Sequence, residues 1–364
     1  MAVYTTIDNP ELHFQAEIYT GNGGTLALTL DGDENMQPDL VWVKSRTQNN
    51  SHVWFDVIRG FAGGKEIQSN NTGAENASDS GGYGYVSAVG SDGFTVQAGS
   101  TAGDYTNVSS QNYVAWCFKG GGSASSNSNG SITSSVSANT TAGFSISTLD
   151  VGDTGNITFG HGIGAAPTFF VIKATSGTGG WVVYSLAVGN NKYLYLNNNE
   201  AAATSTSVWQ NTAPTSTVIS TNSSDMQDDR EVVCYAFAPI QGYSKFGTYS
   251  GTGSGSGGAF VFTGFKPALI IMKETDGVDH FGIYDNKRNP GPGNVNGNPL
   301  LQPSDNGAES NAVANQIDFL SNGFKICAEG TNGNFINESG KTYFYAAFAE
   351  SPFVNSNGVP NNAK

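Results

Sequence analysis

Basic residues are scarce in this sequence, and charged residues of either sign are few. Only 13% of its 364 residues are charged, and 16 Lys and Arg stand against 30 Asp and Glu, giving a net charge of −14. A nucleic-acid-binding surface needs clustered Lys and Arg to neutralise phosphates. The composition therefore argues against a nucleic-acid partner.

Cysteines and long apolar runs are also scarce. The three cysteines, Cys117, Cys234 and Cys327, lie far apart without a CxxC spacing, which predicts buried thiols rather than a disulfide framework or a zinc site. No apolar run reaches the roughly 18 residues of a membrane helix. The first residues, MAVYTTIDNPELHF, lack the basic start and apolar segment of a secretory signal. We expect a protein made in the cytoplasm without membrane insertion.

Helical periodicity is missing, whereas turn formers and aromatic residues are abundant. The chain has 48 glycines and 11% aromatic residues, together with many Ser, Thr and Asn. This mixture favours many short strands joined by tight turns. The sequence therefore predicts an all-β fold.

One short motif occurs three times. PDLVWVK (Pro38–Lys44), PTFFVIK (Pro167–Lys173) and PALIIMK (Pro267–Lys273) each place a proline before an apolar run and a lysine after it. Proline is tolerated at the first position of a strand, and a continuous apolar run is typical of a strand covered on both faces. We expect a central core strand whose final lysine, Lys44, Lys173 or Lys273, reaches solvent; a shared ligand contact is the alternative.

The copies agree beyond this motif. The spacing from Pro38 to Tyr113 in the first copy and from Pro267 to Tyr343 in the third differs by one residue. An internal repeat of this kind predicts repeated structural units. We predict three tandem β-sandwiches with jelly-roll or lectin-like topology, at residues 16–121, 142–241 and 242–353.

Three further segments complete the predicted organisation. Residues 122–141 are rich in Gly, Ser and Asn, which predicts a flexible linker between the first two sandwiches. The joint at 237–247 is short, so the second and third sandwiches are expected to pack as a stiff pair. Residues 1–15 form an N-terminal arm that either docks onto a neighbouring domain or subunit or completes the first sandwich. Residues 354–364 form a C-terminal tail.

Several strings resemble a known family when taken together. They include QPDLVWVKSR, SHVWFDVIRG, YVAWCFKGG, GHGIGAAPTFFVIK, FVFTGFKPALIIMK and YFYAAFAESPF. Over about residues 7 to 353 the chain resembles tail-associated virion proteins of tailed bacteriophages, notably those of marine bacteria and cyanobacteria. The family's function is uncharacterised, and no catalytic residues are carried over from it.

The resemblance implies a structural virion component. We expect a tail fibre or tail-tip protein that adheres to a host-surface glycan, located at the tail or particle surface. Other virion proteins are the expected partners, and a homo-oligomer, trimer or ring, is expected by analogy. The alternatives are a capsid decoration or head-appendage protein and an envelope-polysaccharide hydrolase.

The residues themselves give little support for catalysis. His52 precedes Asp56, and His280 precedes Asp285 in the third copy, a spacing that could suggest a base and its orienting carboxylate. The middle copy has Gly180 in place of the histidine, and neither a GxSxG nor an HExxH motif is present. We predict a non-enzymatic protein without catalytic residues or cofactors, in which these histidines lie at hairpin edges.

Four residues are the candidates for ligand binding. Glu75, Glu200 and Glu309 recur once in each copy in Asn- and Ser-rich surroundings. One carboxylate at each place does not make a glycosidase, but it could help to hold a glycan or a cation; an exposed loop acid is the alternative. Trp209 lies in a polar stretch without a counterpart in the other copies, which makes it the candidate for stacking against a sugar.

Calcium is the most plausible metal, although the pattern is weak. The loops DGDEN and DVGDTGN place hard oxygen ligands near glycines, as calcium sites do. Neither loop matches an EF-hand, and turns are rich in Asp and Asn in any case. The weak candidates are Asp31, Asp33, Asp150 and Asp153.

Overall fold

The computed structural model describes residues 4–77, 80–101, 105–153, 155–226, 230–288, 298–312, 316–328 and 336–360. Its antiparallel sheets confirm the predicted all-β fold, with a β-sandwich architecture. Helical turns are limited in these residues to η1 (Pro10–Leu12), α1 (Ser80–Tyr83) and η2 (Ser224–Met226). None of the helices described has the length and hydropathy needed to cross a lipid bilayer.

The first set of strands, which we call repeat 1, forms two sheets. The larger sheet has the order β1-β8-β3-β4-β5, and the smaller sheet has the order β2-β7-β6. The strands are β1 (Phe14–Thr20), β2 (Thr25–Leu28), β3 (Leu40–Ser45), β4 (Val53–Asp56), β5 (Ile67–Gln68), β6 (Tyr85–Gly90), β7 (Gly93–Gln97) and β8 (Asn112–Phe118).

The second set, repeat 2, forms an eight-stranded sheet in the order β16-β15-β14-β13-β18-β11-β10-β9 and a two-stranded sheet of β12 and β17. The strands are β9 (Ser125–Asn127), β10 (Ser134–Asn139), β11 (Phe144–Asp150), β12 (Asn156–Gly160), β13 (Phe169–Ala174), β14 (Trp181–Ser185), β15 (Lys192–Tyr195), β16 (Ala203–Thr204), β17 (Val218–Asn222) and β18 (Glu231–Phe237).

The third set, repeat 3, has a four-stranded sheet in the order β19-β27-β21-β22, a three-stranded sheet in the order β20-β26-β25, and the pair β23-β24. The strands are β19 (Ser244–Ser250), β20 (Phe260–Phe262), β21 (Phe265–Glu274), β22 (Gly282–Asp285), β23 (Asn298–Leu300), β24 (Ser310–Ala312), β25 (Ile317–Leu320), β26 (Gly323–Ile326) and β27 (Thr342–Pro352).

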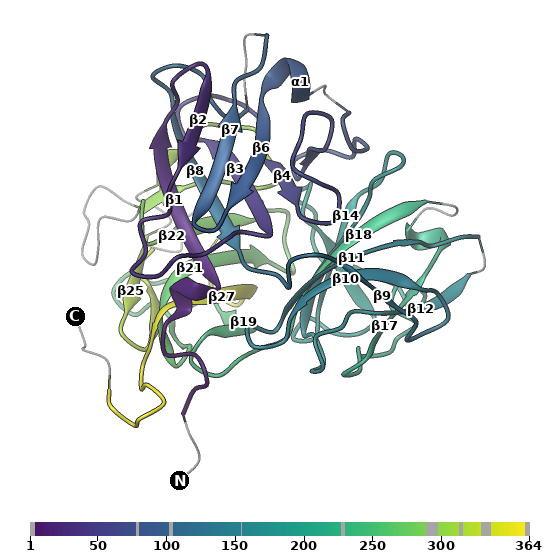
Figure 1. Ribbon diagram of the computed structural model, residues 1–364. Helices are drawn as coiled ribbons and strands as arrows, with labels where there is room; N and C mark the ends of the chain where they lie inside the picture. Colours follow the sequence, from purple (N-terminus) through teal and green to yellow (C-terminus); the bar gives the residue numbers. More distant parts are fainter. Residues whose placement is uncertain are drawn as a thin grey trace.

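The three repeats share one strand order. In each large sheet the last strand lies between two earlier strands at equivalent positions: β8 between β1 and β3, β18 between β11 and β13, and β27 between β19 and β21. Figure 1 shows repeat 1 in purple and blue above repeat 3 in green and yellow, with repeat 2 in teal beside them. The sequence repeat is thus a repeat of topology, while the domain boundaries stay a prediction.

The segment 122–141 is not the flexible linker that its composition predicted. It contains β9 and β10, and β10 pairs with β11 along the edge of the large sheet of repeat 2. Small polar side chains suit a strand at the solvated edge of a sheet, where backbone hydrogen bonds rather than side-chain burial hold the chain. The prediction of flexibility is therefore wrong, because composition alone does not show which backbone groups find partners.

The repeated apolar strands are covered on both faces, as predicted. Every residue of β3 is buried. Val41 and Val43 face the small sheet of repeat 1, whereas Leu40 and Trp42 face a core shared with the other repeats. The continuous apolar run of this strand is therefore required by two separate cores.

Three phenylalanines from equivalent positions meet in the shared core. Phe118 and Phe237 are the last residues of β8 and β18, and Phe348 lies within β27. They are paired in register with β3, β13 and β21 respectively. Their ring centroids are 5.7, 5.1 and 5.4 Å apart, all edge to face. Edge-to-face contacts are favourable for aromatic rings. We call these residues the phenylalanine trio; they join all three repeats, not only the second and third.

The N-terminal arm contacts repeat 3 and the segment that follows it. Tyr4 Oη donates a hydrogen bond to the carbonyl of Gly264 in repeat 3 at 2.9 Å, and Asp8 accepts one from the backbone N–H of Ser356 in the C-terminal tail at 2.6 Å. The end of the predicted arm also enters repeat 1, because β1 begins at Phe14. Both predicted roles of this segment are therefore present.

The three repeated lysines are buried rather than solvated, so that prediction is wrong. Lys44, Lys173 and Lys273 are each 0% exposed. Each ammonium donates to the carbonyl of the next residue, at 2.7, 2.8 and 2.6 Å, and to a second carbonyl in the loop that follows. The loop folds back over the strand end, so carbonyl oxygens replace water around the charge.

Burial of these lysines predicts that stability rises with pH. Burial lowers the pKa of Lys44 to about 7 and the pKa values of Lys173 and Lys273 to about 8. An unfolded lysine titrates near 10.4, so the unfolded chain binds more protons between these limits. The contribution of these lysines to stability should therefore rise from about pH 7 to about pH 10, by at most about 1.4 kcal/mol per pH unit for each lysine. Burial raises the pKa values of the three cysteines, which opposes this rise above about pH 8.5.

Urea unfolding midpoints at pH 7, 8, 9 and 10 check this prediction. Lys44→Met removes one titrating group, so its midpoint should rise less steeply than that of the wild type. The variant Lys192→Met, at an exposed position, is the control and should keep the wild-type slope. Equal slopes for the wild type and Lys44→Met would show that Lys44 does not titrate in this range.

The phenylalanine trio predicts a large loss of stability on truncation. Phe237→Ala should lower the free energy of unfolding by about 3–5 kcal/mol, because it empties a site where the three repeats meet. Phe260→Ala, at a 49% exposed position, is the matched control and should change it by no more than about 0.5 kcal/mol. Thermal unfolding followed by circular dichroism measures the difference. A similar small effect for both variants would contradict a shared core.

Candidate functional site

The repeats contact each other in a closed cycle through equivalent backbone hydrogen bonds. A loop of each repeat donates one N–H to the residue that follows β13, β21 or β3 in the next repeat. The pairs are Glu75 N to Thr175 O at 2.9 Å, Ala202 N to Thr275 O at 2.8 Å and Glu309 N to Arg46 O at 2.8 Å. Repeat 1 therefore contacts repeat 2, repeat 2 contacts repeat 3, and repeat 3 contacts repeat 1.

This pattern corrects the predicted set of recurring acids. Glu75 and Glu309 are equivalent, but Ala202 stands at their position in repeat 2. Glu200 lies two residues earlier, where its N–H donates to Asn198 Oδ1 at 3.1 Å, as the N–H groups of the equivalent glycines do in the other repeats. The sequence match was displaced by two residues. Glu200 is exposed and is not the counterpart of Glu75.

At the interface between repeats 1 and 2, buried charges hold the two sheets together. Arg59 Nε donates to Asp56 Oδ2 at 2.6 Å, and the same carboxylate accepts a hydrogen bond from Tyr235 Oη of repeat 2 at 2.7 Å. Arg59 Nη1 donates to Glu75 at 3.1 Å, and Lys65 Nζ donates to the other Glu75 oxygen at 2.7 Å. With its bonds to backbone carbonyls and to Tyr235, every N–H of the Arg59 guanidinium is used.

At the interface between repeats 3 and 1 the same network recurs. Arg288 Nε donates to Asp285 at 2.6 Å, and Trp116 Nε1 of repeat 1 donates to the same carboxylate at 3.0 Å. Glu309 accepts from Arg288 at 3.0 Å and from Arg46 at 2.8 and 2.9 Å. Burial opposes ionisation of Glu309, but the two arginines outweigh it and hold the pKa of Glu309 below its ordinary value.

The third interface uses uncharged side chains at these positions. Ser185 and Val188 of repeat 2 stand where the other repeats have the Asp–Arg pair, and Ala346 of repeat 3 stands where they have Tyr235 or Trp116. Val188 packs against the shared core. The backbone geometry of the cycle is therefore kept while its side-chain chemistry differs from one interface to another.

The histidines do not pair with the aspartates that follow them. His52 is fully buried, and its Nδ1 accepts a hydrogen bond from Trp42 Nε1 at 3.0 Å. Burial lowers the pKa of His52 well below its ordinary value. His52 directly precedes β4 at the end of the β3-β4 hairpin, as predicted, and its ring is stacked on Trp116 in the core. Asp56 is occupied by Arg59 and not by His52.

Trp209 is not an exposed recognition residue, so that prediction is also wrong. It is 1% exposed and packs edge to face against Phe170 and Tyr184, with ring centroids 4.9 and 5.6 Å away. Its Nε1 donates to the carbonyl of Lys192 at 2.9 Å. Trp209 lies in a turn with polar neighbours, but its indole points into the core of repeat 2, so local polarity did not indicate exposure.

The calcium candidates make other contacts. Asp31 forms an ion pair with Lys287 at 2.6 Å, and Asp150 Oδ1 accepts from the backbone of Gly152 at 2.9 Å. Asp33 and Asp153 are exposed. Over the residues that the structure describes, no group of three or more His, Cys, Asp or Glu side chains is arranged to hold a metal ion.

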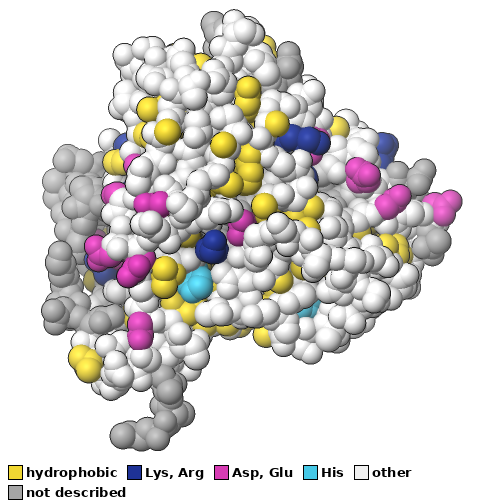
Figure 2. Space-filling model, viewed as in Figure 1, with side chains coloured by type: hydrophobic (Ala, Val, Ile, Leu, Met, Phe, Trp, Pro, Cys, Tyr) yellow, Lys and Arg dark blue, Asp and Glu magenta, His cyan; other side chains and the backbone are white. Residues whose placement is uncertain are grey.

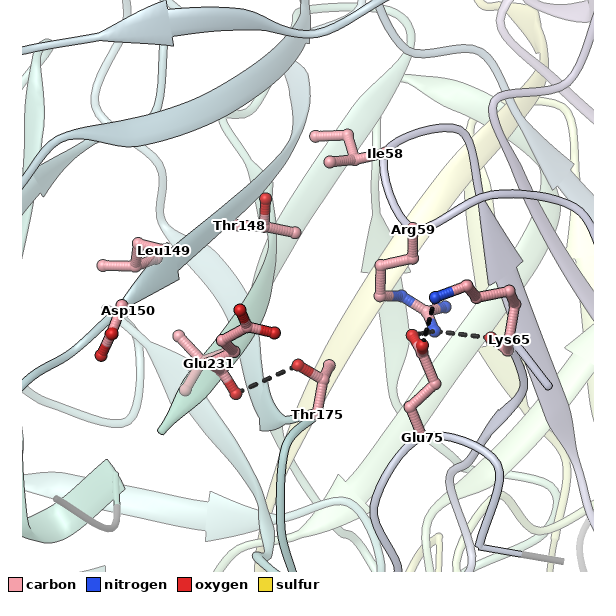
Figure 3. Close-up of a pocket in the computed structure, with 10 residues that line it drawn as sticks. Ile58, Arg59, Lys65, Glu75, Thr148, Leu149, Asp150, Thr175 and Glu231 are labelled. Carbon is pink, nitrogen blue, oxygen red and sulfur yellow. Dashed lines mark hydrogen bonds and ion pairs between the residues drawn. The ribbon is translucent and has the colours of Figure 1, made fainter. Parts of the chain in front are cut away.

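A polar cleft opens between repeats 1 and 2, with a volume of about 330 Å³. Figure 3 shows Arg59, Lys65 and Glu75 on one side and Asp150 and Glu231 on the other. Asp150 and Glu231 are opposite each other on β11 and β18. We call this hollow the interface cleft; Ile58, Thr148, Leu149, Thr175 and Val232 complete its lining.

A second surface lies on the outer face of the β20-β26-β25 sheet. Phe260 and Phe262 are each 49% exposed, while Val261 between them faces inward. Phe260 is opposite Lys325 of β26, and Lys325 is opposite Asp318 of β25, so aromatic and charged residues form one row. We call this surface the aromatic face. The alternation in AFVFTG was the sequence signal for it, and the sequence reasoning missed it.

The cysteines add no disulfide, as predicted. All three are free, and Cys117 and Cys234 are buried. Cys327 is only half-buried, and its Sγ donates to Asp318 Oδ2 at 3.3 Å. On the surface seen in Figure 2, acidic side chains are spread along both sides and basic ones are few, in keeping with the net charge.

The buried ion pairs predict a large effect for removing one partner. Asp285→Ala leaves the buried guanidinium of Arg288 without its carboxylate, which should lower the free energy of unfolding by about 3–5 kcal/mol. Lys287→Met breaks the more exposed pair with Asp31 and is the control, with an expected loss of at most about 1 kcal/mol. Denaturant unfolding of both variants compares the two losses. Equal losses would contradict a special role for the buried pair.

One family model matches most of this chain. No curated protein matches this chain, and neither does any solved structure. The family described as "Domain of unknown function (DUF7483)" matches residues 9–352, which include all three repeats. The chain therefore belongs to the DUF7483 family.

Proposed function

We propose that this protein is a structural component of a tailed-bacteriophage particle, a tail fibre or tail-tip appendage that adheres to a glycan on the host surface. The sequence resemblance over about residues 7 to 353 supports the particle role. Other particle proteins are its partners, and it acts as a homo-oligomer at the particle surface.

The way in which charges are used supports a mechanical role. At two interfaces, the acidic and basic side chains that could do chemistry are instead paired inside the protein, as in Asp56–Arg59 and Asp285–Arg288. Buried pairs of this kind are costly to separate once formed. A closed cycle of backbone contacts, reinforced at two interfaces by buried ion pairs, suits a protein that must keep its shape under load. The proposal includes no catalytic step.

The aromatic face carries the adhesive part of the proposal. Exposed aromatic rings offer flat apolar surfaces to the C–H face of a sugar. Lys325 and Asp318, in the same row as Phe260, offer charged groups that form strong hydrogen bonds with hydroxyls. In repeat 1 the position of Phe260 is occupied by Ala27, so this surface is particular to repeat 3.

A glycan array tests adhesion. The double variant Phe260→Ser/Phe262→Ser should weaken binding to host-surface polysaccharide at least tenfold, because it removes both exposed rings. Val278→Ser changes an exposed apolar residue elsewhere, at 68% exposure, and should bind like the wild type. Wild-type binding by the double variant would place adhesion elsewhere on the protein.

Labelling of intact particles tests the location. Antibodies against the purified chain, viewed by electron microscopy, should mark the tail. Marking of the head would favour the capsid-decoration alternative, and unmarked particles together with no chain detected in them by mass spectrometry would remove the virion role.

A further inference from the structure

The interface cleft lies beside a position at which the side chain of repeat 2 differs from that of repeat 1. Thr175 in repeat 2 and Arg46 in repeat 1 are equivalent. The carbonyl of each accepts the N–H of the glutamate from the preceding repeat in the cycle, and the N–H of each donates at 2.8 Å to the first residue of the last strand, Glu231 or Asn112. The backbone around both positions is therefore the same.

Arg46 fills its position with a guanidinium group. Its Nε and Nη2 donate to the two oxygens of Glu309 at 2.9 and 2.8 Å, a bidentate pair. This geometry matches the planar fork of arginine to the two oxygens of a carboxylate. At the interface between repeats 3 and 1, this position therefore holds a guanidinium group that binds the glutamate of the other repeat.

Thr175 leaves the corresponding space open. Its Oγ1 turns back to the carbonyl of Glu231 at 3.1 Å, and the space beyond it belongs to the interface cleft of about 330 Å³. Ligand sites begin at about 300 Å³. The cleft is therefore large enough for a side chain such as the one that occupies the other interface.

The charges that line the cleft favour a cation. Two cationic side chains, Arg59 and Lys65, line it together with three carboxylates, those of Glu75, Asp150 and Glu231. Arg59 has no N–H left for a ligand, because all of them are used within the protein. A ligand guanidinium must displace Lys65 Nζ from Glu75 Oε1, which it holds at 2.7 Å. Lys65 is 42% exposed, so this exposed ion pair is lost at small cost.

The residues at the ends of the neighbouring strands also differ between the two charged interfaces. At the other charged interface the residues at the positions of Asp150 and Glu231 are Thr20 and Asn112, which are uncharged and hydrogen-bonded to each other at 3.0 Å. The two carboxylates are thus added where the arginine is missing. Like charges placed opposite each other on neighbouring strands are unfavourable unless a cation lies between them.

We propose that the interface cleft binds the guanidinium group of an arginine side chain from a partner protein, in the position that Arg46 occupies between repeats 3 and 1. Glu75 is the bidentate partner, and Asp150 and Glu231 contact the remaining N–H groups. The inference rests on the proposed function only in that a particle component has protein partners; it does not use the aromatic face.

Saturation-transfer NMR with the full chain tests this inference. The probe is N-acetyl-arginine amide, and its neutral counterpart of similar shape is N-acetyl-citrulline amide. The arginine probe should give at least a fivefold larger signal than the citrulline probe, and the signal should fall with added salt because the attraction is electrostatic. Equal signals from the two probes would overturn the proposal.

Two variants locate the binding. Asp150→Asn/Glu231→Gln removes two charges at exposed positions and should reduce the arginine signal at least fivefold, while Glu200→Gln, at an exposed acid outside the cleft, should leave it unchanged. Thr175→Arg supplies the guanidinium from the chain itself, so it should abolish the signal and raise the melting temperature. Undiminished arginine binding by Thr175→Arg would overturn the proposal.

A third probe, glucosamine, separates this inference from the proposed function. If glucosamine gives a signal that Thr175→Arg abolishes while the arginine probe gives none, the cleft takes an amino sugar and the guanidinium assignment is wrong. Glycan-array binding through Phe260 and Phe262 should be unaffected by Thr175→Arg, so failure of either proposal can be recognised without the other.

Discussion

The structure depends on the meeting of three equivalent phenylalanines, Phe118, Phe237 and Phe348, in one core. Each lies on the last strand of its repeat, which pairs with the two strands beside it. A position fixed from both sides in this way cannot move without disturbing its whole sheet. Because the three rings touch, the placement of one repeat sets the placement of the other two.

Around this core the same backbone contact is made three times with different side chains. Two interfaces bury an Asp–Arg pair, and the third has Ser185 and Val188 at the same positions. Paired buried charges and apolar contacts can be similar in net stability, so the substitution of one for the other is compatible with a single architecture. The interface cleft has a similar origin. Thr175 stands at the position that Arg46 has in repeat 1, while the backbone contacts at the two positions are the same.

Sequence reasoning was most successful for the secondary structure and for the residues of the core. The repeated apolar strands, the all-β class and the free cysteines could be predicted because strand burial and periodicity depend on local residue type. Sequence reasoning failed where the burial or pairing of a residue depends on segments that are distant in the sequence. Trp209 lies in a polar stretch and Lys44 ends an apolar strand, but both side chains are buried, and 122–141 gains its order from pairing with β11. The contacts that Glu75 makes with Thr175 and Glu309 makes with Arg46, each across two repeats, could not be predicted from spacing.

Native-state hydrogen exchange measured by mass spectrometry tests the shared core most directly. Peptides that cover β8, β18 and β27 would be followed at increasing urea concentrations below the unfolding transition. If the three repeats depend on one core, the slowest amides of all three strands open with the same free energy and the same dependence on urea. If the slowest amides of one strand exchange through a separate opening of lower free energy, the repeats are independent units and the account is wrong.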